Sequence, residues 1–481
     1  MNNKKIISLD QGSSSSRALV FDSQGRVIAR AARAVNTIRP QEGLSEFDGW
    51  ELLQGQLACL QEVLQQINAQ EVIAISVATQ RSTVVFWDRL TGKPLAPVLS
   101  WQDGRAQSQS AQADLPQEAV HNLTGLYKTP FYSAAKIAWV LQNIPSVRQA
   151  ETEGRLCVGP VASYLIWHLT NGRVFACDPT LAQRTLLFNI SSLNWEPQLL
   201  NAFGIRREIL PNIKRTCDDY GTYANDGLSI PIRVCVGDQQ AALKALRMVS
   251  GGACINYGTG AFFMRHTGTQ CHLLPGLLTS VGTQTANGCE YLLEGPVHAC
   301  ATLFAWLNEI GISCSADEID FWCEQAKKPV QFLPALGGLG APYWDFNASA
   351  VFAGFSPLTK KADVVLGVVE GLSCLLADIV FYAERYGIKS SDIKVTGGLS
   401  KNKSLLRAQA DILQMRLLPC AEVEGTAVGA ALLAAEDMGL DCSEWETMHL
   451  LPAVEPSLDP EVAEEKYIKW HQFLNWCQIR K

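Results

Sequence analysis

The most familiar phosphate and metal motifs are missing from this sequence. No GxxxxGK[ST] run occurs, which excludes the common phosphate-binding loop. The 15 cysteines include no CxxC pair, and the 7 histidines form no HxxxH or HExxH pair, so a structural zinc site is not expected. Most cysteines lie singly in apolar runs, as at Cys235, Cys254 and Cys374. This usage is typical of small buried side chains in a reducing compartment, so we expect a cytoplasmic protein.

Excess charge of one sign and long apolar runs are also missing. Only 18% of the 481 residues are charged, and the net charge of −7 comes from scattered acids and bases. This pattern predicts no nucleic-acid partner and no membrane surface. No uninterrupted apolar stretch approaches the roughly 18 residues of a membrane helix, and Asp10 interrupts the first one too early for a signal peptide. A globular chain of this length is expected to form two large domains.

The segment from Ile6 to Asp22 is the most informative part of the chain. It predicts two apolar strands joined by a turn of small, hydroxyl-bearing residues, Gly12 to Ser16, with Asp10 near the end of the first strand. Backbone N–H groups of such a turn can bind phosphate, and the acid can hold a metal ion. The alternative is an ordinary polar hairpin turn, which this segment by itself does not exclude. The loop resembles that of actin-like ATPases and sugar kinases.

The pattern restarts in the second half of the chain. Residues 251–263 again predict two strands joined by a turn of small residues, Gly258 to Gly260. In each half, strands and helices alternate after the antiparallel strands, which indicates a weak internal duplication and an α/β fold. We therefore expect an N-terminal domain at 1–249, a C-terminal domain at 250–481 and a central cleft between them.

Several residues at predicted strand ends carry groups suited to phosphoryl transfer. Asp238 ends a predicted strand and precedes a helix, as expected of a general base positioned for an acceptor hydroxyl. The turn from Gly258 to Gly260 can bring N–H groups to a transferring phosphoryl group, and Gly397 and Gly398 leave room for an adenine ring. Taken singly, each feature is also explained as an ordinary turn or a helix N-cap.

Taken in order, these segments resemble the FGGY carbohydrate kinases, and among them the glycerol kinases. The resemblance spans nearly the whole chain and rests on Asp10–Ala18, Gly92–Pro94, Phe131–Asn143, Arg184–Ile190, Gly237–Ala242, Asn256–Gly260 and Gly338–Asp345. It implies two actin-like (ribonuclease H-like) domains. It also implies transfer of the γ-phosphate of ATP, with Mg²⁺, to a hydroxyl of a small polyol or sugar. Whether the chain forms a homo-oligomer stays open.

The resemblance also implies roles for individual residues. Asp238 would be the catalytic base and, together with Asp10, would hold the metal ion. The substrate site would comprise Arg81, Ser82, Trp101, Phe131, Asp238, Gln239 and Phe262, with Trp101 and Phe262 as its apolar walls. The nucleotide site would comprise Gly12, Ser13, Ser14, Ser15, Arg17, Thr259, Gly398 and Asn402.

The acceptor positions depart from the glycerol-kinase pattern. An Arg-Glu pair is expected there, but this chain has Arg81-Ser82, so a neutral hydroxyl replaces a carboxylate that accepts strong hydrogen bonds. Phe131 stands where a tyrosine is expected, and Asp103 resembles the ketopentose kinases. Because a site built to bond hydroxyls discriminates strongly when a partner is missing, we expect another polyol or a keto-sugar in place of glycerol.

Three alternatives stay open at this point. One is a ketopentose kinase of the xylulose or ribulose type. Another is a non-catalytic actin-like ATP-binding protein, which Arg81, Trp101 and Phe262 disfavour because such a protein has no acceptor to enclose. The third is a degenerate kinase without turnover, suggested by Ala301 and Ala305, where the family has a glycine and a glutamine.

Overall fold

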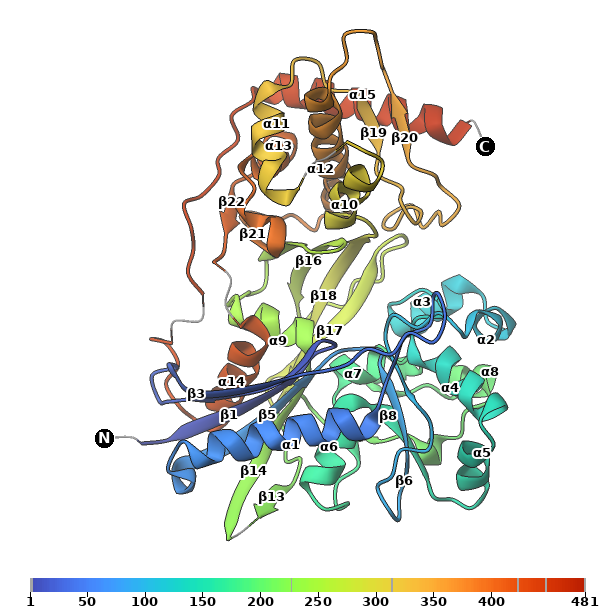
Figure 1. Cartoon of the computed structure of the whole chain (residues 1–481), viewed down its shortest axis with the longest axis vertical. Coiled ribbons are helices and arrows are strands. Elements are labelled where there is room, and N and C mark those ends of the chain that lie inside the picture. The colour runs from blue at the N-terminus through green and yellow to red at the C-terminus, as the bar shows by residue number, and fades with distance from the viewer. Residues whose placement is uncertain (1–2, 226, 313–314, 422–423, 446–447, 480–481) are drawn as a thin grey trace.

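The computed structural model of this chain contains two α/β halves, each built around a six-stranded mixed sheet (Figure 1). The structure describes residues 3–225, 227–312, 315–421, 424–445 and 448–479. The two sheets confirm the expected α/β fold with two parts.

The first sheet comprises β1 (Lys5–Gln11), β2 (Ser15–Phe21), β3 (Val27–Ala34), β5 (Val72–Thr79), β13 (Thr222–Asn225) and β14 (Leu228–Gly237). Its strand order is β13-β14-β5-β1-β2-β3. β1 pairs antiparallel with β2 and parallel with β5, and β14 pairs parallel with β5. Because parallel strands run in one direction, the carboxyl ends of β1, β5 and β14 meet at a single edge of the sheet.

The rest of the first half surrounds this sheet. Three smaller sheets comprise β4 (Glu46–Phe47) with β6 (Val84–Asp88), β7 (Val98–Leu99) and β8 (Leu156–Pro160), then β9 (Ala176–Cys177) with β12 (Asn212–Ile213), and β10 (Phe188–Asn189) with β11 (Asn194–Trp195). The helices are α1 (Gly49–Gln65), α2 (Gln107–Gln112), α3 (Gln117–Thr124), α4 (Ser133–Asn143), α5 (Pro145–Thr152), α6 (Val161–Leu169), α7 (Pro179–Gln183), α8 (Pro197–Phe203) and α9 (Asp238–Ala245).

The second sheet repeats the central arrangement of the first. It comprises β15 (Ala253–Tyr257), β16 (Ala261–Gly268), β17 (Leu278–Thr285), β18 (Gly288–Val297), β21 (Ile393–Thr396) and β22 (Leu417–Pro419), in the order β17-β18-β16-β15-β21-β22. β15 pairs antiparallel with β16 and parallel with β21, as β1 does with β2 and β5. A ribbon of β19 (Gln331–Leu333) and β20 (Val351–Ala353) lies outside this sheet. The helices are α10 (Ala301–Glu309), α11 (Ile319–Gln325), α12 (Lys361–Arg385), α13 (Lys403–Leu413), α14 (Gly425–Asp437) and α15 (Pro460–Ile479).

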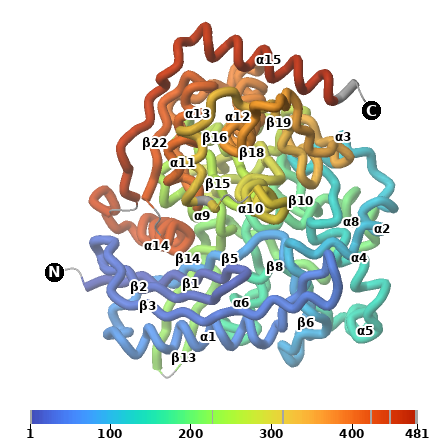
Figure 2. The backbone as a smooth tube through the Cα atoms, turned by 45° about the horizontal axis from the view of Figure 1, so that its top comes forward, coloured from blue at the N-terminus to red at the C-terminus, as the bar shows by residue number. Residues whose placement is uncertain are grey.

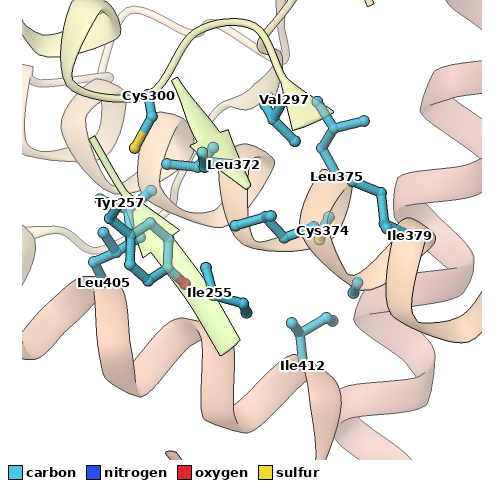
Figure 3. Packing of buried hydrophobic residues seen from close by; sticks show 14 of the residues in the cluster. Ile255, Tyr257, Val297, Cys300, Leu372, Cys374, Leu375, Ile379, Leu405 and Ile412 are labelled. Atoms are coloured by element: carbon cyan, nitrogen blue, oxygen red, sulfur yellow. The ribbon is translucent and has the colours of Figure 1, made fainter. Parts of the chain in front are cut away.

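α12 is the central helix of the second half. An 18-residue window of α12 has a mean hydropathy of 2.2, long and apolar enough in composition to cross a membrane, yet 83% of that window is buried inside the protein. Figure 3 shows Leu372, Leu375 and Ile379 of this helix in the same apolar cluster as Ile255 and Val297 of the second sheet. Burial on this scale identifies α12 as a core helix of the second half.

α14 follows the second sheet in sequence but packs against the first. It contacts β1, β5, β14 and α9, and it lies beside β1 in both views of the chain (Figures 1 and 2). A Cβ atom at Gly429 would lie 1.7 Å from the carbonyl oxygen of Ala241 in α9, so glycine is needed for this approach. The two halves therefore interlock, and the domain boundary near residue 250 stays a prediction.

Candidate active site

The two predicted acids lie at the same edge of the first sheet. Asp10 and Val236 both align with Ala78 of the intervening strand β5, and Asp238 directly follows β14 as the first residue of α9. One strand separates them, so their backbones are about 10 Å apart. The two carboxylates interact electrostatically, because the charge of Asp238 contributes to raising the pKa of Asp10.

The Asp10 carboxylate is buried beside the cation of Arg17. Arg17 lies 3.0 Å from its Oδ2 atom across the β1–β2 hairpin. Burial raises the pKa of Asp10 to about 6; Arg17 opposes this shift, and the acids Asp238 and Glu424 add to it. Oδ2 of Asp10 and Nε of Arg17 are both buried without a hydrogen-bond partner. Such atoms suit a cation and a phosphate respectively.

The Asp238 carboxylate is oriented by its own helix and by one arginine. Its Oδ1 atom accepts the backbone N–H of Gln239 at 2.8 Å, and Nε of Arg81 lies 3.7 Å away. Burial raises the pKa of Asp238, while the charge of Arg81 opposes that shift. A carboxylate held at a helix start and made more basic by burial can accept a proton from a hydroxyl.

The β1–β2 turn has the predicted form. The N–H of Gly12 donates to the carbonyl of Ser15 at 3.0 Å and closes the turn. Ser14 is exposed at its tip, and Ser13 and Ser15 are half-buried beside it. Ser16 is buried and donates to Gln11, so its hydroxyl serves the hairpin itself. The three serines at the tip are therefore the hydroxyls available to a ligand.

The predicted nucleotide residues of the second half gather around the end of β15. The carbonyl of Thr259 accepts the N–H of Cys300 at the start of α10. A Cβ atom at Gly397 would lie 2.4 Å from Asn256, whereas a Cβ atom at Gly398 would meet open space. Asn402 caps α13 by accepting the N–H of Leu405 at 2.8 Å. Only its amide N–H₂ group is left for a nucleotide.

A pocket of about 250 Å³ lies between the two halves, as the predicted cleft requires. Its first wall comes from α9 and includes Gln239 and Leu243, and its second wall includes Asn256, Thr396 and Gly397. A larger cavity of about 610 Å³ lies beneath α15, but none of the predicted site residues lines it. The interdomain pocket is lined by one predicted site residue, Gln239, which directly follows Asp238.

Arg81 belongs to a buried charge network that crosses between the halves. The Arg81 side chain donates to the amide oxygen of Gln239, and its Nη1 atom lies 3.7 Å from Glu294 on β18. Both carboxylate oxygens of Glu294 lie 2.6 Å from Nη2 of Arg184. Burial and the nearby charge of Arg184 lower the pKa of Arg81 to about 10. Sequence reasoning missed Glu294, a single acid in the apolar strand 291–295.

Ser82 is held by its carbonyl oxygen. Its backbone adopts the left-handed conformation with φ of 62°, which is uncommon for a residue with a side chain. The fully buried ammonium group of Lys136 donates to the carbonyls of Ser82 at 2.9 Å and Ser100 at 2.7 Å. Burial lowers the pKa of Lys136 to about 7. This lysine, missed as a functional residue, joins the loop of Ser82 to the loop that precedes Trp101.

The predicted aromatic residues differ in their surroundings. Trp101 and Phe131 are 44% and 48% exposed, as expected of residues facing a ligand. Phe262 instead packs beside Leu243 and Met264 in the apolar cluster next to α9. Among the described residues, no ring contact joins Phe262 to either of the other two rings. The roles of Trp101 and Phe262 as walls of the acceptor site stay a prediction.

The carboxylate of Asp103 is bound by protein donors. It is fully buried, accepts the backbone N–H of Ser45 at 2.7 Å, and pairs with Arg105 at 2.7 Å. Both oxygens are therefore occupied by protein donors. Asp103 gives no geometric support for the resemblance to ketopentose kinases.

Comparison with known proteins identifies the family. A profile of the FGGY family of carbohydrate kinases, N-terminal domain, matches residues 5–244, and a profile of its C-terminal domain matches residues 253–438. The chain belongs to the FGGY carbohydrate kinases. It is therefore an ATP-dependent phosphotransferase, as predicted, and the reading as a non-catalytic actin-like protein is disfavoured.

Relatives and solved structures agree with this assignment. The chain is 36% identical to a glycerol kinase of Shewanella piezotolerans over 93% of its length and 94% of the relative, and 36% identical to a glycerol kinase of Thermus brockianus over 89% of each. The crystal structure of Plasmodium falciparum glycerol kinase with ADP covers 98% of both chains at 27% identity, with a TM-score of 0.91. A xylulose kinase of Rhodospirillum rubrum shares the fold at 20% identity, with a TM-score of 0.88 over 99% of both chains. This FGGY kinase is thus similar to glycerol kinases.

Proposed function

We propose that this FGGY kinase transfers the γ-phosphate of ATP to a hydroxyl of a polyhydroxylated acceptor other than glycerol, with Asp238 as the general base. The observation that carries the proposal is that Asp10 and Asp238 lie at one sheet edge, and that Gln239, which follows Asp238, lines the interdomain pocket. Phosphoryl transfer depends mainly on positioning and charge, and the carboxylates of Asp10 and Asp238 are two charged groups held in fixed positions at this edge.

Asp238 acts on the acceptor. Its Oδ atoms accept the proton of the attacking hydroxyl, and the helix start of α9 fixes their direction. Arg81 and Gln239 flank this carboxylate and donate to the remaining oxygens of the acceptor. Trp101 and Phe131 cover its carbon chain from the exposed side.

Asp10 acts on the metal ion that accompanies ATP. Mg²⁺ prefers oxygen ligands and keeps several waters, and when bound it neutralises charge on the phosphates. The buried Oδ2 atom of Asp10, without a hydrogen-bond partner, fits such an ion, with Asp238 on the far side of β5. The described residues contain no cluster of three or more metal-ligating side chains, so Asp10 and Asp238 would hold the ion together with groups that the protein does not supply.

The nucleotide is held by both halves. The β1–β2 turn, with Ser13 to Ser15 and Arg17, faces the phosphates from the first half. Thr259 contacts them from the second half, while the open space at Gly398 and the amide group of Asn402 accommodate the adenosine. Cytoplasmic location and homo-oligomerisation stay predictions.

An acceptor screen tests this proposal. Purified protein with ATP and Mg²⁺ is expected to release ADP only when an acceptor is present, and the best acceptor in a panel of polyols and ketopentoses is expected to exceed glycerol in kcat/KM. The reason is that Ser82 offers a neutral hydroxyl in place of an ionised hydrogen-bond acceptor. Glycerol as the best acceptor would contradict the proposal. ADP release without any acceptor would indicate an ATPase.

A further inference from the structure

Arg81 is a buried cation whose hydrogen bonds go to neutral groups. Its side chain is 10% exposed, and its hydrogen bonds go to the amide oxygens of Gln239 and Gln240, which are neutral. The carboxylates of Asp238 and Glu294 each lie 3.7 Å away, beyond the 2.7–2.9 Å range typical of charge-assisted hydrogen bonds. Among the described residues, no carboxylate lies within hydrogen-bond distance of this guanidinium group.

Both neighbouring carboxylates have other roles. Glu294 binds Arg184 through both oxygens at 2.6 Å, so its charge is shared with a second buried cation. Asp238, on the proposed function, takes up a proton during the reaction and then carries no charge. At that stage Arg81 and Arg184 together face one carboxylate, and a buried charge without a partner is unfavourable.

The residues next to Arg81 add no negative charge. Ser82 is neutral, and the ammonium group of Lys136 lies against its carbonyl at 2.9 Å. Ser133 donates to the same carbonyl at 3.1 Å. Asp103 and Glu46 both pair with Arg105, at 2.7 Å and 2.6 Å. Among the described residues, the carboxylates that face Arg81 are therefore Asp238 and Glu294, each at 3.7 Å.

We propose that the acceptor supplies the missing negative charge, and that the substrate is a polyhydroxy acid whose carboxylate binds Arg81. This inference rests on the proposed function, since it names the acceptor class for the same site. A guanidinium group is the preferred partner of a carboxylate because its N–H groups match the two oxygens.

The geometry favours a short acid. Nε of Arg81 lies 3.7 Å from Asp238, and its Nη2 atom donates to Gln239, a residue that lines the interdomain pocket. A carboxylate that displaces the Gln239 oxygen stays close to a hydroxyl directed at Asp238. Acids with only a few carbons between the two groups meet both requirements.

The experiment compares acids with polyols of the same chain length. D-glycerate is paired with glycerol, D-erythronate with erythritol, and D-gluconate with D-glucitol, and kcat/KM is measured for each with ATP and Mg²⁺. The acid is expected to exceed its polyol by about 100-fold in at least one of the two shorter pairs, the usual scale for a buried charge-assisted bond. Ser82→Glu introduces a competing carboxylate and is expected to reverse that preference. Ser82→Gln has the same size without the charge and is expected to keep the acid ahead.

Each outcome is decisive. A polyol that exceeds its acid in every pair overturns this inference and leaves the proposed function intact. Equal acid-to-polyol ratios in Ser82→Glu and Ser82→Gln also overturn it, because charge would then have no effect. Acceptor-independent turnover, or none with any neutral or acidic acceptor, overturns the proposed function and this inference with it.

Discussion

The two halves of the molecule share one strand arrangement but differ in charge at the matching positions. Asp10 stands one residue before the end of β1, and Asn256 stands one residue before the end of β15. Asp238 follows β14, the outer parallel strand of the first sheet, whereas Cys420 follows β22, its counterpart in the second. The first half thus carries the acids, and the second half carries amide, hydroxyl and backbone groups.

On the proposed function, the two halves share one fold but carry out different parts of the reaction. A carboxylate can bind a metal ion or accept a proton, and both functions are needed next to the reacting hydroxyl of the acceptor. Neutral groups and glycine turns serve a nucleotide, whose phosphates bind backbone N–H groups and whose adenine needs open space, as at Gly398. A duplicated sheet can therefore place donor and acceptor at facing edges without using the same side chains twice.

The largest expected effect comes from removing Asp238, the proposed base. Asp238→Asn is expected to lower kcat by about 10³-fold, because the amide cannot accept the proton of the acceptor hydroxyl. A change in the nucleotide turn of the second half, Thr259→Val, is expected to act mainly on the KM for ATP. Steady-state kinetics at saturating acceptor separate the two effects. A loss of kcat in Thr259→Val equal to that in Asp238→Asn would show that the halves are not divided in this way.

Local patterns in the sequence predicted both hairpins and the acid after β14. Small residues between apolar runs mark a turn wherever they occur, and an aspartate between a strand and a helix is a local signal. The pairing of Arg184 with Glu294 could not be predicted, because 110 residues separate them and neither lies in a distinctive local pattern. Lys136 did offer a signal, since a charged residue stands alone in the buried run Ser133–Ala138. Such a residue must satisfy its donors internally.

The contact between the halves can be tested at the buried pair of Arg184 and Glu294. Glu294→Gln is expected to lower the free energy of unfolding by about 3 kcal/mol, since it leaves two buried guanidinium groups without a full counter-charge. Glu370→Gln is the matched control, because Glu370 pairs with Lys466 at 2.7 Å on a partly exposed surface within the second half. That change is expected to cost less than about 1 kcal/mol. Denaturant unfolding measures both, and equal losses would mean that the interdomain pair has no special role.

The smallest expected effect tests which half α14 belongs to. Gly429→Ala places a methyl group where the Ala241 carbonyl of α9 now lies, so α14 and α9 must separate, at a cost of about 1–3 kcal/mol. Gly425→Ala on the same helix is the control, since the nearest atom to its added methyl group is 3.7 Å away. Gly425 is the first residue of α14, where the helix preference of alanine over glycine has less effect than in a helix interior, so this control is expected to be close to neutral. Hydrogen exchange then locates the damage. Faster exchange in β1 and β5 after Gly429→Ala would show that α14 stabilises the first half, which it also contacts. Faster exchange confined to β21 and β22 would show that it stabilises the second half instead.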